Sequence, residues 1–162
     1  MATESRFVRI RKVIEAPRQR VFRAWTTLEE VSKWWGPPGY STLSVEIDLR
    51  VGGKYRIAMQ APGNERGVLS GTYREVHPPE RLAYTWSWEG TTVDGKEVYH
   101  PETLVTVEFH DLGGRSTEII LTHGPFSDDE LYDMHDQGWL NTLAKLEELL
   151  QDAQIDPHNR RS

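Results

Sequence analysis

The chain has 162 residues, 37% of them hydrophobic and 27% charged, and contains no cysteine, which indicates one globular domain without disulfides, thiol nucleophiles or thiolate metal ligands. The net charge of −6 argues against a general nucleic-acid binder, which needs a basic face. Because no apolar run reaches the roughly 20 residues of a membrane helix, and the N-terminal residues lack a secretory signal pattern, we expect a cytoplasmic protein without a membrane span.

The first elements in chain order are a strand and two short helices. Residues 7–14 alternate in part between apolar and polar side chains, which predicts a strand. Pro17 opens the first helix, because proline is tolerated at the first helical position. Thr27 and Glu30 have the spacing of a capping box, which predicts a second helix that ends at the glycine and proline turn 36–39.

Strands separated by turns follow the two helices. Alternation and flanking turn residues place them at 43–48, 54–59, 68–76, 82–88, 103–110 and 115–123, with a longer loop over about 89–102. Strands joined by short turns form antiparallel sheets, so we predict the α+β class. We assign residues 1–155 to a single domain and residues 156–162 to a polar C-terminal tail.

A long helix from about Asp128 to about Gln151 is predicted to close the chain. Ser127 and Glu130 form a capping-box pattern at its start. At about 100° per residue, one stripe of this helix contains Leu131, His135, Trp139, Thr142, Leu146, Leu149 and Leu150, with Gly138 at its edge. We expect this stripe to cover one face of the sheet, with His135 near its middle and with Gly138 either allowing close approach or leaving space.

The strands have a matching aromatic face. The side chains assigned to the helix-facing side are Tyr55, Ile57, Met59, Leu82, Tyr84, Trp86, Trp88, Val105, Val107, Phe109, Ile119, Leu121 and His123. Such a face opposite a glycine-containing stripe favours an apolar hollow, typical of ligand sites. Plain core packing is the alternative, and the pair Trp34–Trp35 is either core or a lid over the hollow.

Segments spread over nearly the whole chain carry a resemblance to a known family. They are residues 15–26, Lys33-Trp34-Trp35-Gly36-Pro37, Arg50-Val51-Gly52-Gly53-Lys54-Tyr55, the diproline turn 76–82, residues 104–109, Leu121-Thr122-His123, and His135-Asp136-Gln137-Gly138-Trp139 with Leu143 and Leu146-Glu147. In this order they resemble the activator of heat-shock-protein-90 ATPase-like family of the START-like (SRPBCC) superfamily. The resemblance implies a helix-grip fold, in which a curved antiparallel sheet wraps around the long C-terminal helix.

The resemblance also implies a range of functions. The wider superfamily binds lipids, sterols, polyketides and plant hormones under the long helix, and a minority of its members are cyclases, hydratases or hydrolases. We therefore expect this protein to bind a small, largely apolar molecule in a hydrophobic cavity between the sheet and the last helix, with no chemistry assigned. The residues expected to line this cavity are Trp35, Tyr55, Ile57, Met59, Tyr84, Trp86, Trp88, Val107, Leu121, His123, His135, Gly138, Trp139 and Thr142.

Two other functions remain open. His123 or His135 is the candidate general base of a cyclase- or hydrolase-type enzyme, or the two together with Glu102 form a metal site. A hydrogen-bonded structural pair is the simpler interpretation, so we assign no catalytic residue, metal or cofactor. The second alternative is a chaperone ATPase co-factor that acts through its surface, although the eukaryotic co-factors of this family carry an additional domain.

The charge is unevenly distributed along the chain. Residues 4–23 carry seven basic and two acidic side chains, whereas residues 128–152 carry eight acidic and one basic. These stretches form either two solvated faces of opposite sign, or the contact surfaces of a self-association or a chaperone complex.

Overall fold

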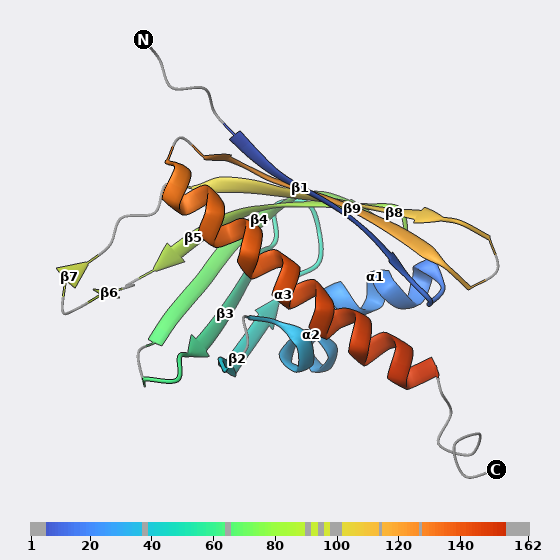
Figure 1. Cartoon of the computed structure of the whole chain (residues 1–162), viewed down its shortest axis with the longest axis horizontal. Helices are drawn as coiled ribbons and strands as arrows, with labels where there is room; N and C mark the ends of the chain where they lie inside the picture. The colour runs from blue at the N-terminus through green and yellow to red at the C-terminus, as the bar shows by residue number, and fades with distance from the viewer. Residues whose placement is uncertain are drawn as a thin grey trace.

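The computed structural model describes residues 6–36, 39–63, 66–89, 92–93, 96–97, 102–113, 115–126 and 128–154 (Figure 1). Its elements in chain order are β1 (Arg6–Ile14), α1 (Arg18–Thr26), α2 (Leu28–Trp34), β2 (Ser41–Ile47), β3 (Lys54–Gln60), β4 (Arg66–His77), β5 (Arg81–Glu89), β6 (Thr92–Val93), β7 (Lys96–Glu97), β8 (Thr103–Asp111), β9 (Thr117–Phe126) and α3 (Asp129–Gln154). The predicted tail, residues 156–162, lies outside the described residues.

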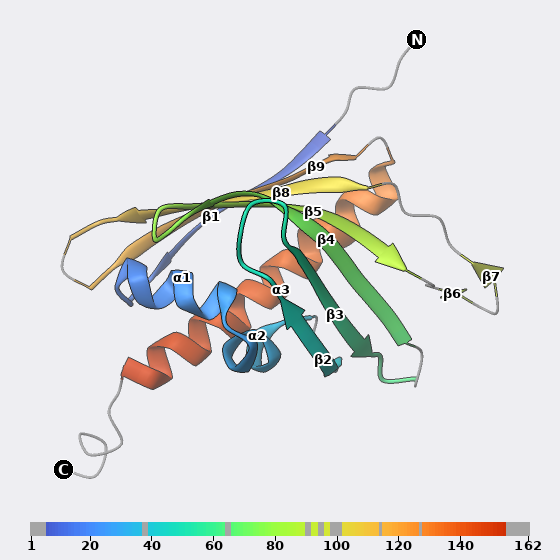
Figure 2. The ribbon, with the colours of Figure 1, turned by 180° about the vertical axis from the view of Figure 1, so that it is seen from behind.

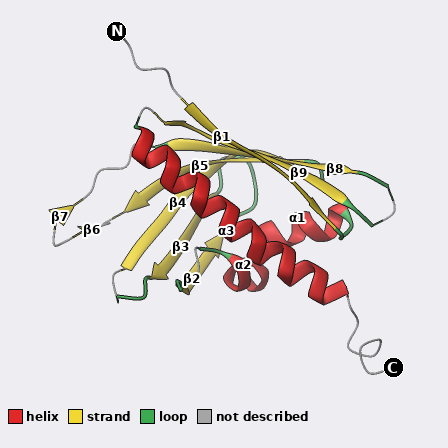
Figure 3. Cartoon of the chain, in the orientation of Figure 1, coloured by secondary structure: helices red, strands yellow, loops and turns green. Residues whose placement is uncertain are grey.

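Seven strands form one antiparallel sheet in the order β1-β9-β8-β5-β4-β3-β2, and β6 pairs with β7 within the predicted loop. Each strand predicted from the sequence is present within a few residues of its expected bounds. The sheet arches over α3, which crosses its concave side (Figures 1 and 2). The two short helices lie on that same side (Figure 3). The predicted α+β, helix-grip architecture is confirmed.

The helices begin close to the predicted positions, but α2 lacks the predicted cap and Asp128 caps α3. Thr27 precedes α2 without a side-chain cap hydrogen bond, and Glu30 instead forms an ion pair with Arg20 of α1. The capping box predicted there is therefore wrong. At α3 the Asp128 carboxylate accepts hydrogen bonds from two backbone N–H groups of the first turn, at 2.8 and 3.2 Å. Asp128 is thus the capping residue, while Ser127 lies outside the described residues.

The basic and the acidic stretch meet within the chain. Arg6 and Lys12 of β1 form ion pairs with Asp129 and Glu147 of α3, at 2.9 and 3.0 Å. Arg6 also lies over the ring of Tyr132, 3.9 Å from its centroid. Because these side chains are partly solvated, each pair contributes little to stability. Their effect is to align the edge strand β1 with the helix.

The buried face of α3 is centred further along the helix than predicted. Its buried residues are Trp139, Thr142, Leu143, Leu146 and Leu150. His135, expected near the middle of this face, is only half-buried, and Leu143, outside the predicted stripe, is buried. The reason is that the C-terminal half of α3 packs against α1 and α2 as well as against the sheet, which covers more of its circumference. None of the described helices is long and apolar enough to span a membrane.

Candidate functional site

Tryptophan rings fill much of the space between the sheet and α3. Trp25 comes from α1, Trp34 and Trp35 from the end of α2, Trp86 from β5 and Trp139 from α3. All five are buried, and neighbouring ring centroids lie 4.8 to 6.2 Å apart. Aromatic pairs at such separations attract one another beyond simple area burial. We call these five residues the tryptophan cluster.

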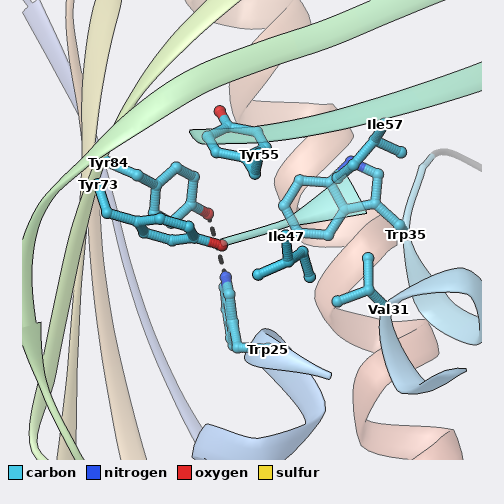
Figure 4. A pocket seen from close by; sticks show the side chains of 8 residues that line it. All are labelled: Trp25, Val31, Trp35, Ile47, Tyr55, Ile57, Tyr73 and Tyr84. Atoms are coloured by element: carbon cyan, nitrogen blue, oxygen red, sulfur yellow. Dashed lines mark hydrogen bonds between the residues drawn. The ribbon is translucent and has the colours of Figure 1, made fainter. Parts of the chain in front are cut away.

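An interior cavity lies beside the tryptophan cluster (Figure 4). Its volume is about 10 Å³ and it is lined by Trp25, Val31, Trp35, Ile47, Tyr55, Ile57, Tyr73 and Tyr84. A volume of this size holds about one water molecule. This cavity is not the broad hollow that was expected between Gly138 and the strand bearing Tyr84, Trp86 and Trp88. Neither Gly138 nor Trp88 lines it.

The predicted ligand-lining residues fall into three groups. Those that line the interior cavity are Trp35, Tyr55, Ile57 and Tyr84. Those buried elsewhere in the interior are Met59, Trp86, Val107, Leu121, His123, Trp139 and Thr142. Those only half-buried are Trp88, His135 and Gly138. A Cβ atom at Gly138 would meet nothing within 4 Å, so this glycine leaves space rather than permitting close backbone contact.

Four cavity residues were missing from the predicted set: Trp25, Val31, Ile47 and Tyr73. Trp25 and Val31 are apolar residues of the two short helices α1 and α2. Ile47 and Tyr73 share the alternation of their strands. The sequence around these four residues does not show that the two short helices lie against β2, β3 and β4.

His123 is fully buried, and both of its ring nitrogens are bonded inside the protein. The Trp139 indole N–H donates to Nδ1 at 3.0 Å, so Nδ1 carries no proton. The proton therefore resides on Nε2, which donates to Thr103 Oγ1 at 2.7 Å. Burial, assisted by the neighbouring His135, lowers the pKa of His123 well below 6.5. This neutral imidazole has no lone pair left to accept a proton from a substrate.

His135 lies beside this buried histidine on the first turns of α3. Its Nδ1–H donates to the Leu131 carbonyl at 2.8 Å, and its ring lies 4.7 Å from that of Phe126 and 5.2 Å from that of His123. Glu102, the third member of the conceivable metal site, lines a groove on the opposite face of the sheet. Within the described part of the chain, no three His, Asp or Glu side chains gather into a possible metal site.

The side chains of three buried tyrosines line the cavity, and their hydroxyl groups are neutral. The Trp25 indole N–H donates to the Tyr84 hydroxyl at 3.0 Å (Figure 4). Burial raises the pKa of Tyr55, Tyr73 and Tyr84 above the usual value of 10.0. None of them ionises near neutral pH, so the polar atoms facing the cavity are uncharged.

A larger groove of about 610 Å³ lies on the outer face of the sheet. Its lining residues are Glu46, Ile47, Asp48, Lys54, Tyr55, Arg56, Ser70, Gly71, Thr72, Thr85, Ser87 and Glu102. Tyr55 borders both spaces, because its hydroxyl donates to the Thr85 carbonyl at 2.5 Å. Gly71 permits this contact, since a Cβ there would lie 1.9 Å from the same carbonyl oxygen.

The fold is similar to those of several solved bacterial proteins. A protein from Chromobacterium violaceum is 26% identical over 90% of this chain and 97% of its own, with a TM-score of 0.74. The AHSA1 protein from Silicibacter pomeroyi is 25% identical over 90% and 98%, with a TM-score of 0.77. A protein from Nitrosomonas europaea is 25% identical over 92% and 96%, with a TM-score of 0.73.

No curated protein matches the chain. The family described as "Activator of Hsp90 ATPase homolog 1-like protein" matches residues 15–151, which begin directly after β1 and include α1, α2, the other six strands of the large sheet and most of α3. The chain belongs to this family of Activator of Hsp90 ATPase homolog 1-like proteins.

Proposed function

We propose that the protein binds a small, largely apolar molecule between the sheet and α3, in the space that Trp35 fills in this structure. The observation that carries the proposal is the position of the Trp35 ring. It lines the interior cavity and also lies 6.1 Å from the ring of Trp86 and 5.8 Å from that of Trp139. Removing this one ring would extend the small cavity toward the rings of Trp86 and Trp139.

Trp35 is attached less firmly than Trp25, Trp34 and Trp139. The indole N–H groups of Trp25, Trp34 and Trp139 each donate a hydrogen bond, at 2.9 to 3.0 Å. Within the described part of the chain, no corresponding bond holds the indole of Trp35. Its displacement therefore breaks packing contacts but no side-chain hydrogen bond.

The backbone around Trp35 also suits movement. Trp35 is the C-cap of α2 and precedes Gly36, whose φ is +88°, a conformation that glycine adopts without strain. Lys145 of α3 donates to the Gly36 carbonyl at 2.9 Å and to the Trp35 carbonyl at 3.5 Å. Trp35 thus follows the last turn of α2, where its backbone N–H bonds to the Val31 carbonyl at 3.0 Å and one flexible lysine side chain holds its carbonyl. Rotation of the Trp35 side chain out of the interior breaks neither a helix nor a strand.

The displaced ring sets the size of the ligand. An indole leaves a flat, bicyclic space whose walls are the rings of Trp86 and Trp139 and the tyrosines of the cavity. Rigid aromatic walls give broad contact at little conformational cost, and apolar walls with few polar atoms are typical of ligand sites. We therefore propose a planar ligand of about two fused rings.

The variant Trp35→Ala tests this proposal. We expect it to fold and to bind an uncharged fluorescent naphthalene probe such as prodan, which has two fused rings, more tightly than the native protein, because the probe enters the vacated space. Removing a buried aromatic ring costs about 3–5 kcal/mol, so the fold of each variant is checked by circular dichroism before binding is compared.

Phe22→Ala is the matched control. Phe22 is 6% exposed, close to the 5% of Trp35, but it packs on Phe109 at 5.4 Å and does not line the cavity. If Phe22→Ala takes up the probe as well as Trp35→Ala does, uptake reflects any core defect and the proposal fails. If neither the native protein nor Trp35→Ala takes up the probe, a co-factor role through the surface becomes the leading hypothesis.

A further inference from the structure

The indole N–H of Trp86 is a buried donor without a partner. The Trp86 side chain is 9% exposed, and its Nε1 has no hydrogen-bond partner within the described part of the chain. Buried polar groups in native proteins are nearly always paired, and an unpaired one requires an explanation. Phenylalanine would fill much of the same space without burying a donor.

The side chains around Trp86 do not supply the missing acceptor. The nearest ring is His123, at 4.8 Å between centroids, but its Nδ1 already accepts from Trp139 and its Nε2 carries the proton given to Thr103. The ring of Trp139 lies at 5.4 Å and offers no acceptor atom, because an indole N–H only donates. The ring of His135 lies 6.0 Å away, but Trp86 Nε1 makes no hydrogen bond to it or to any other described residue.

We propose that the bound ligand carries a neutral hydrogen-bond acceptor, such as a carbonyl oxygen, and that this atom accepts from Trp86 Nε1. The inference rests on the proposed function, because the space vacated by Trp35 lies directly beside Trp86. An anionic acceptor is disfavoured, since the adjacent rings of His123 and Trp139 are neutral and offer no positive charge to offset its desolvation. The ligand class is thus a planar, roughly bicyclic ketone, aldehyde, ester or ether.

A matched pair of probes tests the acceptor. Tetralin and 1-tetralone have the same bicyclic frame and differ by one carbonyl in place of a methylene. Both are titrated by isothermal calorimetry into the native protein and into a protein in which Trp86 is replaced by 3-benzothienylalanine, whose sulfur takes the place of the N–H. We expect this replacement to weaken 1-tetralone about fivefold, as loss of one hydrogen bond does, and to leave tetralin unchanged.

The outcomes separate this inference from the proposed function. If neither probe binds the native protein, the proposed function fails and the inference with it. If both bind and the replacement affects them equally, the inference alone is overturned. Comparing the same two probes across both proteins cancels their different solubilities in water.

A second measurement does not depend on any ligand. Replacing Trp86 by 3-benzothienylalanine removes an unpaired donor, so the urea midpoint of unfolding should stay constant or rise. The same replacement at Trp25 removes the bond to Tyr84 and should lower the midpoint. A lowered midpoint at position 86 would show that the surrounding ring faces already satisfy the N–H, which would overturn the inference.

Discussion

Mild acidification should destabilise the protein through His123. The folded state keeps this imidazole neutral, because it is fully buried and because its Nδ1 faces the N–H of Trp139. Its pKa is therefore well below the value of 6.5 expected in the unfolded chain. Below pH 6.5 the unfolded chain binds a proton that the folded protein does not bind, so the free energy of unfolding falls as the pH falls.

The size of this effect follows from proton linkage. The free energy of unfolding changes by about 1.4 kcal/mol per pH unit between the two pKa values and is constant above the upper one. A pH of 5.5 is one unit below the unfolded-state pKa of His123. Lowering the pH from 7.5 to 5.5 should therefore reduce the free energy of unfolding by about 1.4 kcal/mol through His123 alone. Below the depressed pKa of the folded state the loss levels off.

Urea unfolding at the two pH values measures this loss. His123→Gln retains an acceptor for Trp139 and a donor for Thr103 but does not titrate, so its free energy of unfolding should decline less than that of the native protein by this amount. His110→Gln is the control for the loss of a histidine at the surface, because His110 is exposed and its ring bonds to Glu108. Identical pH dependence in the native protein and His123→Gln would refute the reasoning.

Three substitutions test the packing described above. Trp139→Ala should lower the free energy of unfolding by roughly 3–5 kcal/mol, because the ring is 3% exposed; a loss below about 1 kcal/mol in urea would place it outside the core. Gly71→Ala should sharply lower the melting temperature followed by circular dichroism, because the new Cβ would lie 1.9 Å from the Thr85 carbonyl oxygen and 2.7 Å from the Tyr55 ring. An unchanged melting temperature would mean that the strands re-register at no cost. Gly138→Ala should instead raise the free energy of unfolding by about 1 kcal/mol, since nothing lies within 4 Å of the added atom; a decrease would contradict the open surroundings seen here.

Patterns confined to neighbouring residues predicted the elements of this fold well. The alternation over 82–88 identified β5 and placed Tyr84 and Trp86 on the buried side. The same parity argument placed His123 inside the protein. These inferences succeed because strand alternation depends only on the two faces of a sheet, whatever packs against them.

The content of the interior was not predictable in the same way. Whether the space under α3 is open depends on where Trp35 lies relative to Trp86 and Trp139, residues that are far apart in the sequence. The tautomer of His123 likewise depends on Trp139 and Thr103, which come from two other elements. Helix periodicity misplaced the centre of the buried face of α3, because α1 and α2 also pack against this helix. The sequence of α3 alone does not show which other helices cover it.

The continuity of the aromatic interior has an optical consequence. Trp88 lies 6.0 Å from Trp86, so the six tryptophans of the chain form one unbroken series of neighbouring rings from Trp34 to Trp88. At such separations the electronic transitions of indoles couple, and excitation absorbed by one ring migrates to the others. The near-ultraviolet circular dichroism and the fluorescence therefore belong to the assembly of rings, and a molecule that displaces Trp35 alters the signal of all of them at once.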